Sequence, residues 1–208
     1  MRKRFGIVFL VVGILCVAGA LGLITYNALE SDGAGDQSHE RVLVLQDYMN
    51  REIDPSRVTV LDTMHTDDDD DELDPVVYLD GYDYIGALEI PQLKLNLPVM
   101  STWDYEKLRL SPCRQFGSAK DGNLVIAAHN YSTHFGRINT LIPGDEITFT
   151  AMDGTVYTYE VAKSEVVSPT DVEKVAQSGY PLVLYTCTKG GERRITVFCN
   201  LKPDSENK

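Results

Sequence analysis

The chain has 208 residues, of which 43% are hydrophobic, so it is long and apolar enough for one domain with a core and an accessory segment. Its formal net charge of -12 argues against nucleic acid as a partner, because the phosphate backbone favours a basic protein face. Three basic residues stand at positions 2–4, and the acidic residues all follow position 26. The two ends of the chain are therefore expected to lie in different environments.

The first predicted element is a transmembrane helix. Phe5–Tyr26 is an uncharged run of about 22 residues, which at about 1.5 Å per residue spans a bilayer core of about 30 Å. The basic residues before it predict a cytoplasmic N-terminus, and so a single-pass cell membrane protein whose remainder is extracytoplasmic. Ala18-Gly19-Ala20 resembles the cleavage site of a signal peptide, but the apolar run continues beyond it and favours a retained anchor.

Residues 27–82 are interpreted as a linker region that contains one amphipathic helix. Glu30–Gln37 has the composition of a solvated linker, and His39–Met49 carries apolar residues at roughly helical spacing behind a capping Ser38. Asp67–Asp71 is a run of like charge that predicts a mobile acidic segment. Calcium binding there is the alternative, although the run lacks the Gly and the terminal Glu of an EF-hand loop.

Residues 83–208 show short strands separated by turns, which predicts an all-β domain. Asp153-Gly154 is a strong hairpin signal, and Thr170–Gln177 predicts one or two helical turns. Trp103 and Tyr105 are expected to anchor a short helix in the core. The predicted strands are Ile85–Ile90, Leu95–Val99, Asn123–Ala128, Glu146–Thr150, Thr155–Ser164, Leu182–Thr188 and Arg193–Leu201.

The four cysteines are Cys16, Cys113, Cys187 and Cys199. They form no Cys-x-x-Cys pair and have no histidine at metal-ligand spacing, so no metal site is predicted. Three lie outside the predicted membrane helix, so at least one thiol is free unless two chains are cross-linked. Cys113 and Cys199 are interpreted as buried thiols or as a disulfide pair, and their spacing does not decide between these.

Three residues at strand ends suggest acyl-transfer chemistry. Cys187 ends one predicted strand, Arg194 opens the next after a short glycine-rich loop, and His129 follows a third. Acyl transfer needs a thiol that ionises, a group that protonates the leaving amine and a donor to the developing oxyanion. The competing interpretation is structural, because cysteine is often a small buried hydrophobe and an arginine at a strand start is often solvated.

Taken together, these motifs resemble the sortase family of cysteine transpeptidases. The resemblance lies in the Thr-Cys pair at a strand end, the Arg that opens the next strand, the upstream His and the basic-flanked anchor. It runs from about Asp83 to Leu201 and includes Tyr84–Pro91 and Phe135–Leu141. It implies an eight-stranded sortase-type β-barrel with short helices behind one transmembrane helix, with no metal or organic cofactor, in a Gram-positive type of cell.

The resemblance also implies roles for individual residues. Cys187 would attack the Thr carbonyl of an LPXTG-like sorting signal and form a thioester. His129 would protonate the departing amine, and Arg194 would hold the substrate and stabilise the oxyanion. Thr186 and Asn130 are expected to contact the substrate. The partners implied are sorting-signal peptides of surface proteins and an amine acceptor from a cell-wall precursor or a pilin.

The sequence leaves several alternatives open. Arg194 is preferred to Arg193 because adjacent strand residues face opposite ways. His134 is the alternative candidate for the catalytic histidine, but it is expected to be a surface residue in a loop. The helix before the barrel resembles that of class B and class C enzymes. Asp74-Pro75 resembles the lid of a pilin-polymerising sortase, but Val76 stands where such a lid has an aromatic residue. The rival functions are a thiol hydrolase, a pilin-polymerising sortase and a non-catalytic, membrane-tethered β module that binds partners.

Overall fold

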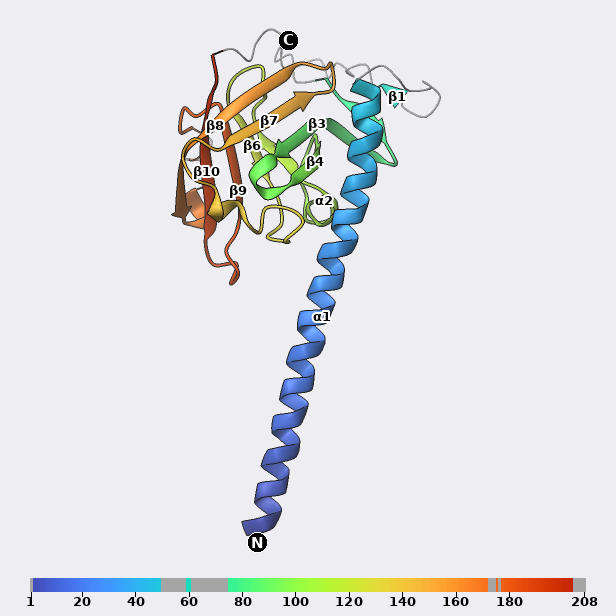
Figure 1. Ribbon diagram of the computed structural model, residues 1–208, viewed down its shortest axis with the longest axis vertical. Helices are drawn as coiled ribbons and strands as arrows, with labels where there is room; N and C mark the ends of the chain where they lie inside the picture. Colours follow the sequence, from blue (N-terminus) through green and yellow to red (C-terminus); the bar gives the residue numbers. More distant parts are fainter. Residues whose placement is uncertain (1, 50–58, 61–74, 172–174, 176, 204–208) are drawn as a thin grey trace.

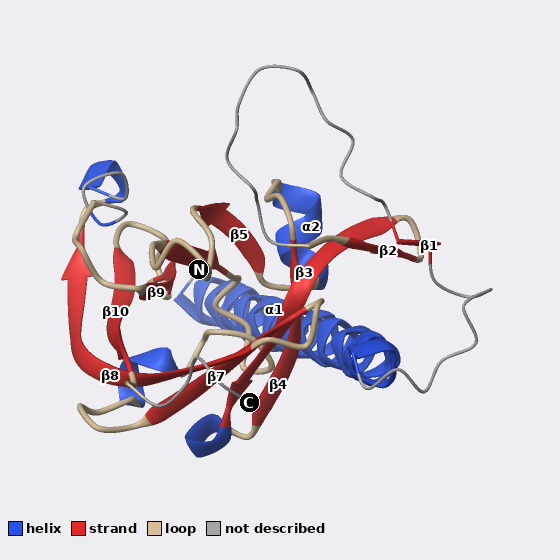
Figure 2. Cartoon of the chain, turned by 90° about the horizontal axis from the view of Figure 1, so that it is seen from above, coloured by secondary structure: helices blue, strands red, loops and turns tan. Residues whose placement is uncertain are grey.

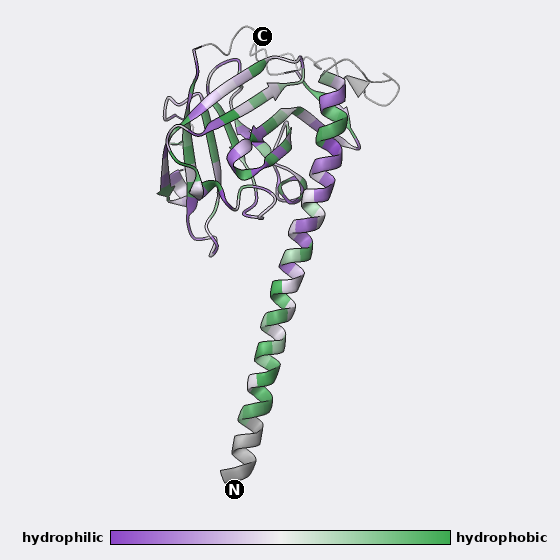
Figure 3. Ribbon diagram, in the orientation of Figure 1, coloured by the Kyte–Doolittle hydropathy of each residue, from purple (hydrophilic) through white to green (hydrophobic). Residues whose placement is uncertain are grey.

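A long N-terminal helix and a β-barrel make up the part of the chain that the computed structural model describes, residues 2–49, 59–60, 75–171, 175 and 177–203. The helix, α1 (Arg2–Met49), projects from the barrel as one unbroken rod (Figure 1). Residues 9–29 of α1 are mostly apolar and exposed, and it is the C-terminal part of the helix that contacts the barrel (Figure 3). By length and composition α1 can cross a membrane, as the sequence predicted.

The prediction of a solvated linker at Glu30–Gln37 is wrong, because these residues are helical and belong to α1. Ser31, Ala34 and Ser38 are buried at 6%, 5% and 0% exposure. Their spacing places them on one helix face, and burial of that face compensates for the poor helix propensity of the glycines between them. The predicted amphipathic helix His39–Met49 is the C-terminal part of α1. The acidic run Asp67–Asp71 and its calcium alternative lie outside the described residues.

The strands form an eight-membered closed barrel. The hydrogen-bonded order is β3-β4-β5-β6-β9-β10-β8-β7, and pairing between β3 and β7 closes the ring, while β2 and β1 extend from β3 outside it. Figure 2 shows α1 crossing beside the barrel near β3 and β4. The strands are β1 (Thr59–Val60), β2 (Val77–Leu79), β3 (Tyr82–Ile90), β4 (Leu95–Met100), β5 (Cys113–Phe116), β6 (Leu124–Ala127), β7 (Glu146–Ala151), β8 (Val156–Val167), β9 (Leu182–Cys187) and β10 (Arg194–Leu201).

The seven strands predicted in the barrel region are all present, so the all-β prediction is confirmed. β5 was missed because it has only four residues and its alternation is interrupted by a register shift against β6. The predicted hairpin turn at Asp153-Gly154 connects β7 and β8. Gly154 has φ +85°, a conformation that glycine adopts without strain.

The barrel interior is filled by apolar side chains from every strand of the ring except β5. Because side chains alternate along a strand, each strand directs one set inward and the other outward. The burial pattern of β7, in which every second residue is buried, follows this rule. The largest fully buried side chains of this core include Ile85, Leu88, Ile90, Leu124, Ile126, Phe135, Ile138, Phe149 and Tyr159.

Short helices connect the strands. α2 (Tyr105–Leu110) is capped by Asp104, whose carboxylate accepts from the backbone N–H groups of Glu106 and Lys107 at 2.8 and 2.7 Å. The predicted core position of Trp103 and Tyr105 is wrong: these rings stack edge to face and are 37% and 77% exposed. Polar capping therefore holds the start of α2. The other short helices are η2 (Pro91–Leu93), η3 (Ile138–Thr140) and η4 (Pro169–Asp171). η4 overlaps the start of the region predicted to be helical, Thr170–Gln177, of which residues 172–174 and 176 are not described.

Candidate active site

Cys187 and Arg194 lie side by side at one end of the barrel. They are direct partners in the antiparallel pairing of β9 and β10. The loop between them is tight, since the N–H of Thr188 donates to the carbonyl of Arg193 at 3.0 Å and Gly191 adopts φ +74°. The chain turns within a few residues, so a thiol and a guanidinium that are separated in the sequence become neighbours.

The two adjacent arginines have different environments. Arg194 donates from Nη1 to the loop carbonyls of Gly191 and Arg193 at 3.0 and 3.2 Å. Arg193 donates from Nη2 to the carbonyl of Val166 on β8, on the far side of β10 from β9. This is the divergence expected of neighbours in a strand. The Arg194 guanidinium remains with the loop that follows Cys187.

His129 follows β6, which runs parallel to β9. The register is continued beyond β6 by two hydrogen bonds, from the Ala128 N–H to the Tyr185 carbonyl at 3.2 Å and from the Thr186 hydroxyl to the Ala128 carbonyl at 2.8 Å. The Asn130 side-chain amide then donates to the Thr188 carbonyl at 3.4 Å. Residues 128–130 therefore run alongside residues 186–188, which places His129 next to the end of β9.

The environment of His129 favours a neutral imidazole. Burial lowers the pKa of His129, the Arg109 guanidinium lowers it further, and the Glu30 carboxylate partly offsets both. The ring stacks on Tyr131 with 4.9 Å between centroids and 28° between planes. A neutral imidazole can accept a proton from a thiol, which is the first step in activating a cysteine nucleophile.

Cys187 differs from the two other cysteines of the barrel in its accessibility. Cys187 is partly exposed, whereas Cys113 and Cys199 are both 0% exposed. Burial raises the pKa of each of these two thiols to about 12, so neither forms a thiolate near neutral pH. All four cysteines are free, so the pairing alternative for Cys113 and Cys199 is wrong.

The two predicted substrate-binding residues support the site from behind. Thr186 is 1% exposed and faces away from the side of β9 that carries Cys187, because the two are adjacent in the strand. Its hydroxyl is used in the bond to Ala128, so the structure does not favour substrate contact there. Asn130 is half-buried and joins the His129 segment to Thr188. Substrate contact by Asn130 remains a prediction.

His134 is not a surface residue, as the sequence interpretation had it. Its side chain is 0% exposed, and its Nε2 lies 3.3 Å from the Ser38 hydroxyl on α1. Burial lowers the pKa of His134 to about 4, with a smaller contribution from His129. Its side chain is completely buried against α1, so it is a poor candidate for proton transfer to a substrate.

Three residues beside His129 were not identified from the sequence: Glu30, Arg109 and Tyr131. Glu30 was assigned to the linker, and Arg109 belongs to a short helix distant in sequence. The signal that was available is the spacing of Ser31, Gly35 and Ser38, small residues on one face of a helix. Among the residues that the structure describes, no group of three or more His, Cys, Asp or Glu side chains is arranged to hold a metal ion.

An accessible cysteine whose strand partner is an arginine and whose neighbouring segment carries a histidine, at one end of a closed β-barrel, defines a candidate site for cysteine acyl transfer. A family model described as the sortase domain matches residues 88–202, which is more than half of the chain. The chain therefore belongs to the sortase family.

Solved structures agree with this assignment at the level of the fold. Sortase C1 from Streptococcus agalactiae is similar with a TM-score of 0.51 and 22% identity, over 61% of this chain and 72% of that one. A sortase D5 transpeptidase from Clostridium perfringens is similar with a TM-score of 0.50 and 23% identity, over 57% of this chain and 79% of that one. Comparison with curated proteins gives no match.

Proposed function

We propose that this protein is a membrane-anchored cysteine transpeptidase that cleaves an LPXTG-like sorting signal and transfers the acyl part to an amine. The observation that carries the proposal is the accessible Cys187 thiol, with Arg194 as its direct strand partner and the His129 segment running beside it. Membership in the sortase family supports this chemistry. The acceptor amine belongs to a cell-wall precursor or to a pilin, and an assay that supplies both kinds of amine distinguishes them.

The proposed first half-reaction forms a thioester. The Cys187 thiol proton passes to the His129 imidazole, and the thiolate attacks the carbonyl carbon of the Thr residue in the sorting signal. The C–N bond to the next residue then breaks, and His129 returns its proton to the departing amine. In the second half-reaction an incoming amine gives a proton to His129 and attacks the thioester carbonyl carbon; the C–S bond breaks, and the Cys187 thiolate that is released takes the proton back from His129.

Arg194 is the proposed donor to the oxyanion that forms in each half-reaction. Its two hydrogen bonds to loop carbonyls both use Nη1. A guanidinium carries five N–H donors, so donors remain for a substrate oxygen while the loop bonds hold the side chain in place. A held donor needs little reorganisation when negative charge develops.

The proposed topology places α1 in the cytoplasmic membrane of a Gram-positive type of cell, with the barrel outside. The apolar, exposed residues 9–29 of α1 and the basic residues at positions 2–4 support this arrangement. We propose three parts: an anchor at 1–26, a connecting region at 27–82 and a catalytic barrel at 83–208. The helix α1 continues without a break across the first of these boundaries.

The test is mass spectrometry of the full chain in detergent micelles, incubated with LPXTG-like peptides and with amines that mimic a cell-wall precursor or a pilin lysine. We expect a peptide cleaved after Thr and joined to one amine, and no product from Cys187→Ala. Cys16→Ala is the matched control, because it removes a thiol from the exposed part of α1.

Two results would contradict the proposed role of Cys187 as a nucleophile. One is full product formation by Cys187→Ala. The other is the absence of any product together with a Cys187 thiol that resists alkylation in the folded protein, which would favour the binding-module alternative. Hydrolysis without transfer to any amine would instead identify a thiol hydrolase.

A further inference from the structure

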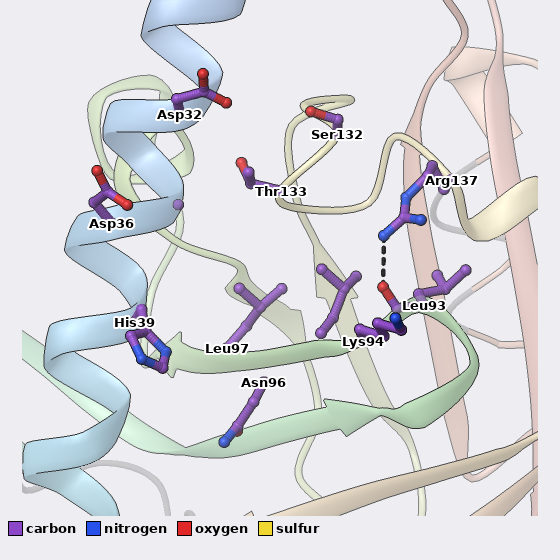
Figure 4. Close-up of a pocket in the computed structure, with 12 residues that line it drawn as sticks. Asp32, Asp36, His39, Leu93, Lys94, Asn96, Leu97, Ser132, Thr133 and Arg137 are labelled. Atoms are coloured by element: carbon purple, nitrogen blue, oxygen red, sulfur yellow. Dashed lines mark hydrogen bonds between the residues drawn. The ribbon is translucent and has the colours of Figure 1, made fainter.

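The C-terminal part of α1 is attached to the loop that follows His129. The Ser31 hydroxyl lies 3.1 Å from the Ser132 hydroxyl, and the Thr133 hydroxyl donates to the Ser31 carbonyl at 2.7 Å. Two helical turns further on, Ser38 donates to the Leu110 carbonyl at 2.7 Å. Figure 4 shows this region, with Thr133 and Ser132 directed towards α1. The helix is thus fixed both to the loop that follows His129, here called the catalytic loop, and to α2.

Gly35 allows this close approach. A Cβ atom at position 35 would lie 2.7 Å from Cγ2 of Thr133, which is too close for a carbon–carbon contact. Thr133 has little freedom to move away, because its hydroxyl donates to the carbonyl of Ser31, which lies on α1 one turn before Gly35. The Thr133 side chain of the loop therefore packs directly against the backbone of α1 at Gly35.

Glu30 lies at the end of this interface that is nearest to His129. Glu30 precedes Ser31 and Tyr131 precedes Ser132, so the contact between the two serines brings Glu30 and Tyr131 together; burial, and after it the Glu30 carboxylate, raises the pKa of Tyr131 to about 12. Nε of Arg109 on α2 lies 3.7 Å from the same carboxylate. The Tyr131 ring in turn stacks on the His129 ring. A continuous set of contacts joins a carboxylate on α1 to the imidazole.

We propose that Glu30 is a positioning residue for His129 and acts through Tyr131. The inference rests on the proton-transfer role proposed for His129. Glu30 holds the Tyr131 hydroxyl, the held Tyr131 ring sets the plane of the imidazole, and the orientation of the imidazole determines whether it can reach the thiol and the leaving amine. In this arrangement the anchor helix is part of the catalytic apparatus as well as an attachment to the membrane.

The charges around His129 predict pKa shifts of opposite sign in two variants, and a general loss of structure would not produce such a pattern. Glu30 stabilises an imidazolium, whereas Arg109 destabilises it. Removing the first should lower the pKa of His129, and removing the second should raise it. The titratable or charged groups near His129 are Glu30 on α1, Arg109 on α2, Tyr131 and His134 on its own loop, and Cys187 and Arg194 on β9 and β10.

The test uses the full chain in detergent micelles with Glu30→Gln, and with Glu40→Gln as the matched control. Glu40 lies on the same helix and is exposed, so both variants remove one negative charge from α1. We expect Glu30→Gln to lower kcat about tenfold with little change in KM, because it disturbs the orientation of one reacting group. We also expect a lower His129 pKa in a histidine-labelled NMR titration.

Two further variants make the result independent of folding defects. Tyr131→Phe removes only the hydroxyl, and it should lower kcat in the same direction as Glu30→Gln. Arg109→Gln should move the His129 pKa upward. The proposal is overturned if Glu30→Gln matches Glu40→Gln in both kcat and the His129 titration. A titration shift specific to Glu30→Gln, in a protein that processes no peptide, would support the coupling and count against the proposed activity.

Discussion

The barrel interior and the face of α1 that packs on the barrel exclude water in different ways. The interior is made of large apolar side chains such as Phe149 and Ile85. The α1 face includes small polar residues, among them Ser31 and Ser38, which bond to the catalytic loop and to α2. Apolar burial tolerates modest rearrangement, but a close polar interface needs each partner in place. The comparison predicts a large, general effect of mutations in the first region and local effects in the second.

The largest effect is expected from Phe149→Ala in the barrel core. Phe149 is 0% exposed, and deleting a buried Phe side chain costs about 3–5 kcal/mol of unfolding free energy. Urea denaturation of the full chain in detergent measures this loss. Ile142→Ala is the control, since Ile142 is 64% exposed, and it should change the free energy by less than about 0.5 kcal/mol. Equal losses in the two variants would contradict the assigned core.

A second effect concerns the buried His134 at the α1 interface. Its pKa is about 4 in the folded protein and about 6.5 in the unfolded chain, so the unfolded state binds the proton first as pH falls. Stability should therefore decrease from about pH 6.5 down to about pH 4, by on the order of 3 kcal/mol from this group. His134→Gln should lose this part of the pH dependence, and His39→Gln, an exposed position on α1, should retain it. Parallel pH profiles for His134→Gln and the unmodified protein would show that His134 is not buried in solution.

A smaller effect is expected from Gly35→Val, compared with Gly33→Val. Both changes add the same side chain to α1, but only position 35 faces Thr133, and nothing lies within 4 Å of the Cβ position at Gly33. We expect Gly35→Val to cost about 1–3 kcal/mol through overpacking. Gly33→Val should be neutral or slightly stabilising, because valine has a better helix propensity than glycine. Thermal unfolding of both variants measures the difference. Indistinguishable Tm values would argue against the close approach of Gly35 and Thr133.

The smallest effect is expected at the cap of α2. Asp104→Ala removes the acceptor for two backbone N–H groups and should cost about 1 kcal/mol. Asp104→Asn should cost only a few tenths, because asparagine caps equally well. Since α2 carries Arg109, the Ala variant should also alter the His129 titration slightly. Denaturation midpoints of the unmodified protein, Asp104→Asn and Asp104→Ala test this order of stability. If Asp104→Asn lost as much stability as Asp104→Ala, the effect would be due to the charge of Asp104 and not to capping.

The strands and the neighbours of Cys187 could be predicted because both follow from local periodicity. Alternation identified β9 and β10, and a short loop between them requires that Cys187 and Arg194 lie close together. Register also explains why Thr186 is buried where the sequence interpretation expected a substrate contact. Adjacent residues in a strand face opposite ways, so Cys187 and Thr186 cannot share a surface.

The attachment of α1 could not be predicted in the same way. Serine and glycine in Glu30–Gln37 are typical of linkers, and their burial depends on partners about 100 positions away in the chain. His134 and Trp103 were misplaced for a related reason. Whether a polar or aromatic side chain is enclosed depends on which surface covers it, and that surface belongs to another element.

The unbroken course of α1 has a consequence for how the protein meets its substrates under the proposed topology. Glu30 follows the last residue of the apolar run by four positions, so it stands only about 6 Å beyond it along the helix axis. The loop between β9 and β10 lies on the side of the barrel towards the N-terminal end of α1 (Figure 1). A substrate that is itself tethered to the bilayer would diffuse in the same plane as the thiol. Its effective concentration would then be set by its density per unit of membrane area, and a peptide free in solution would lack this advantage.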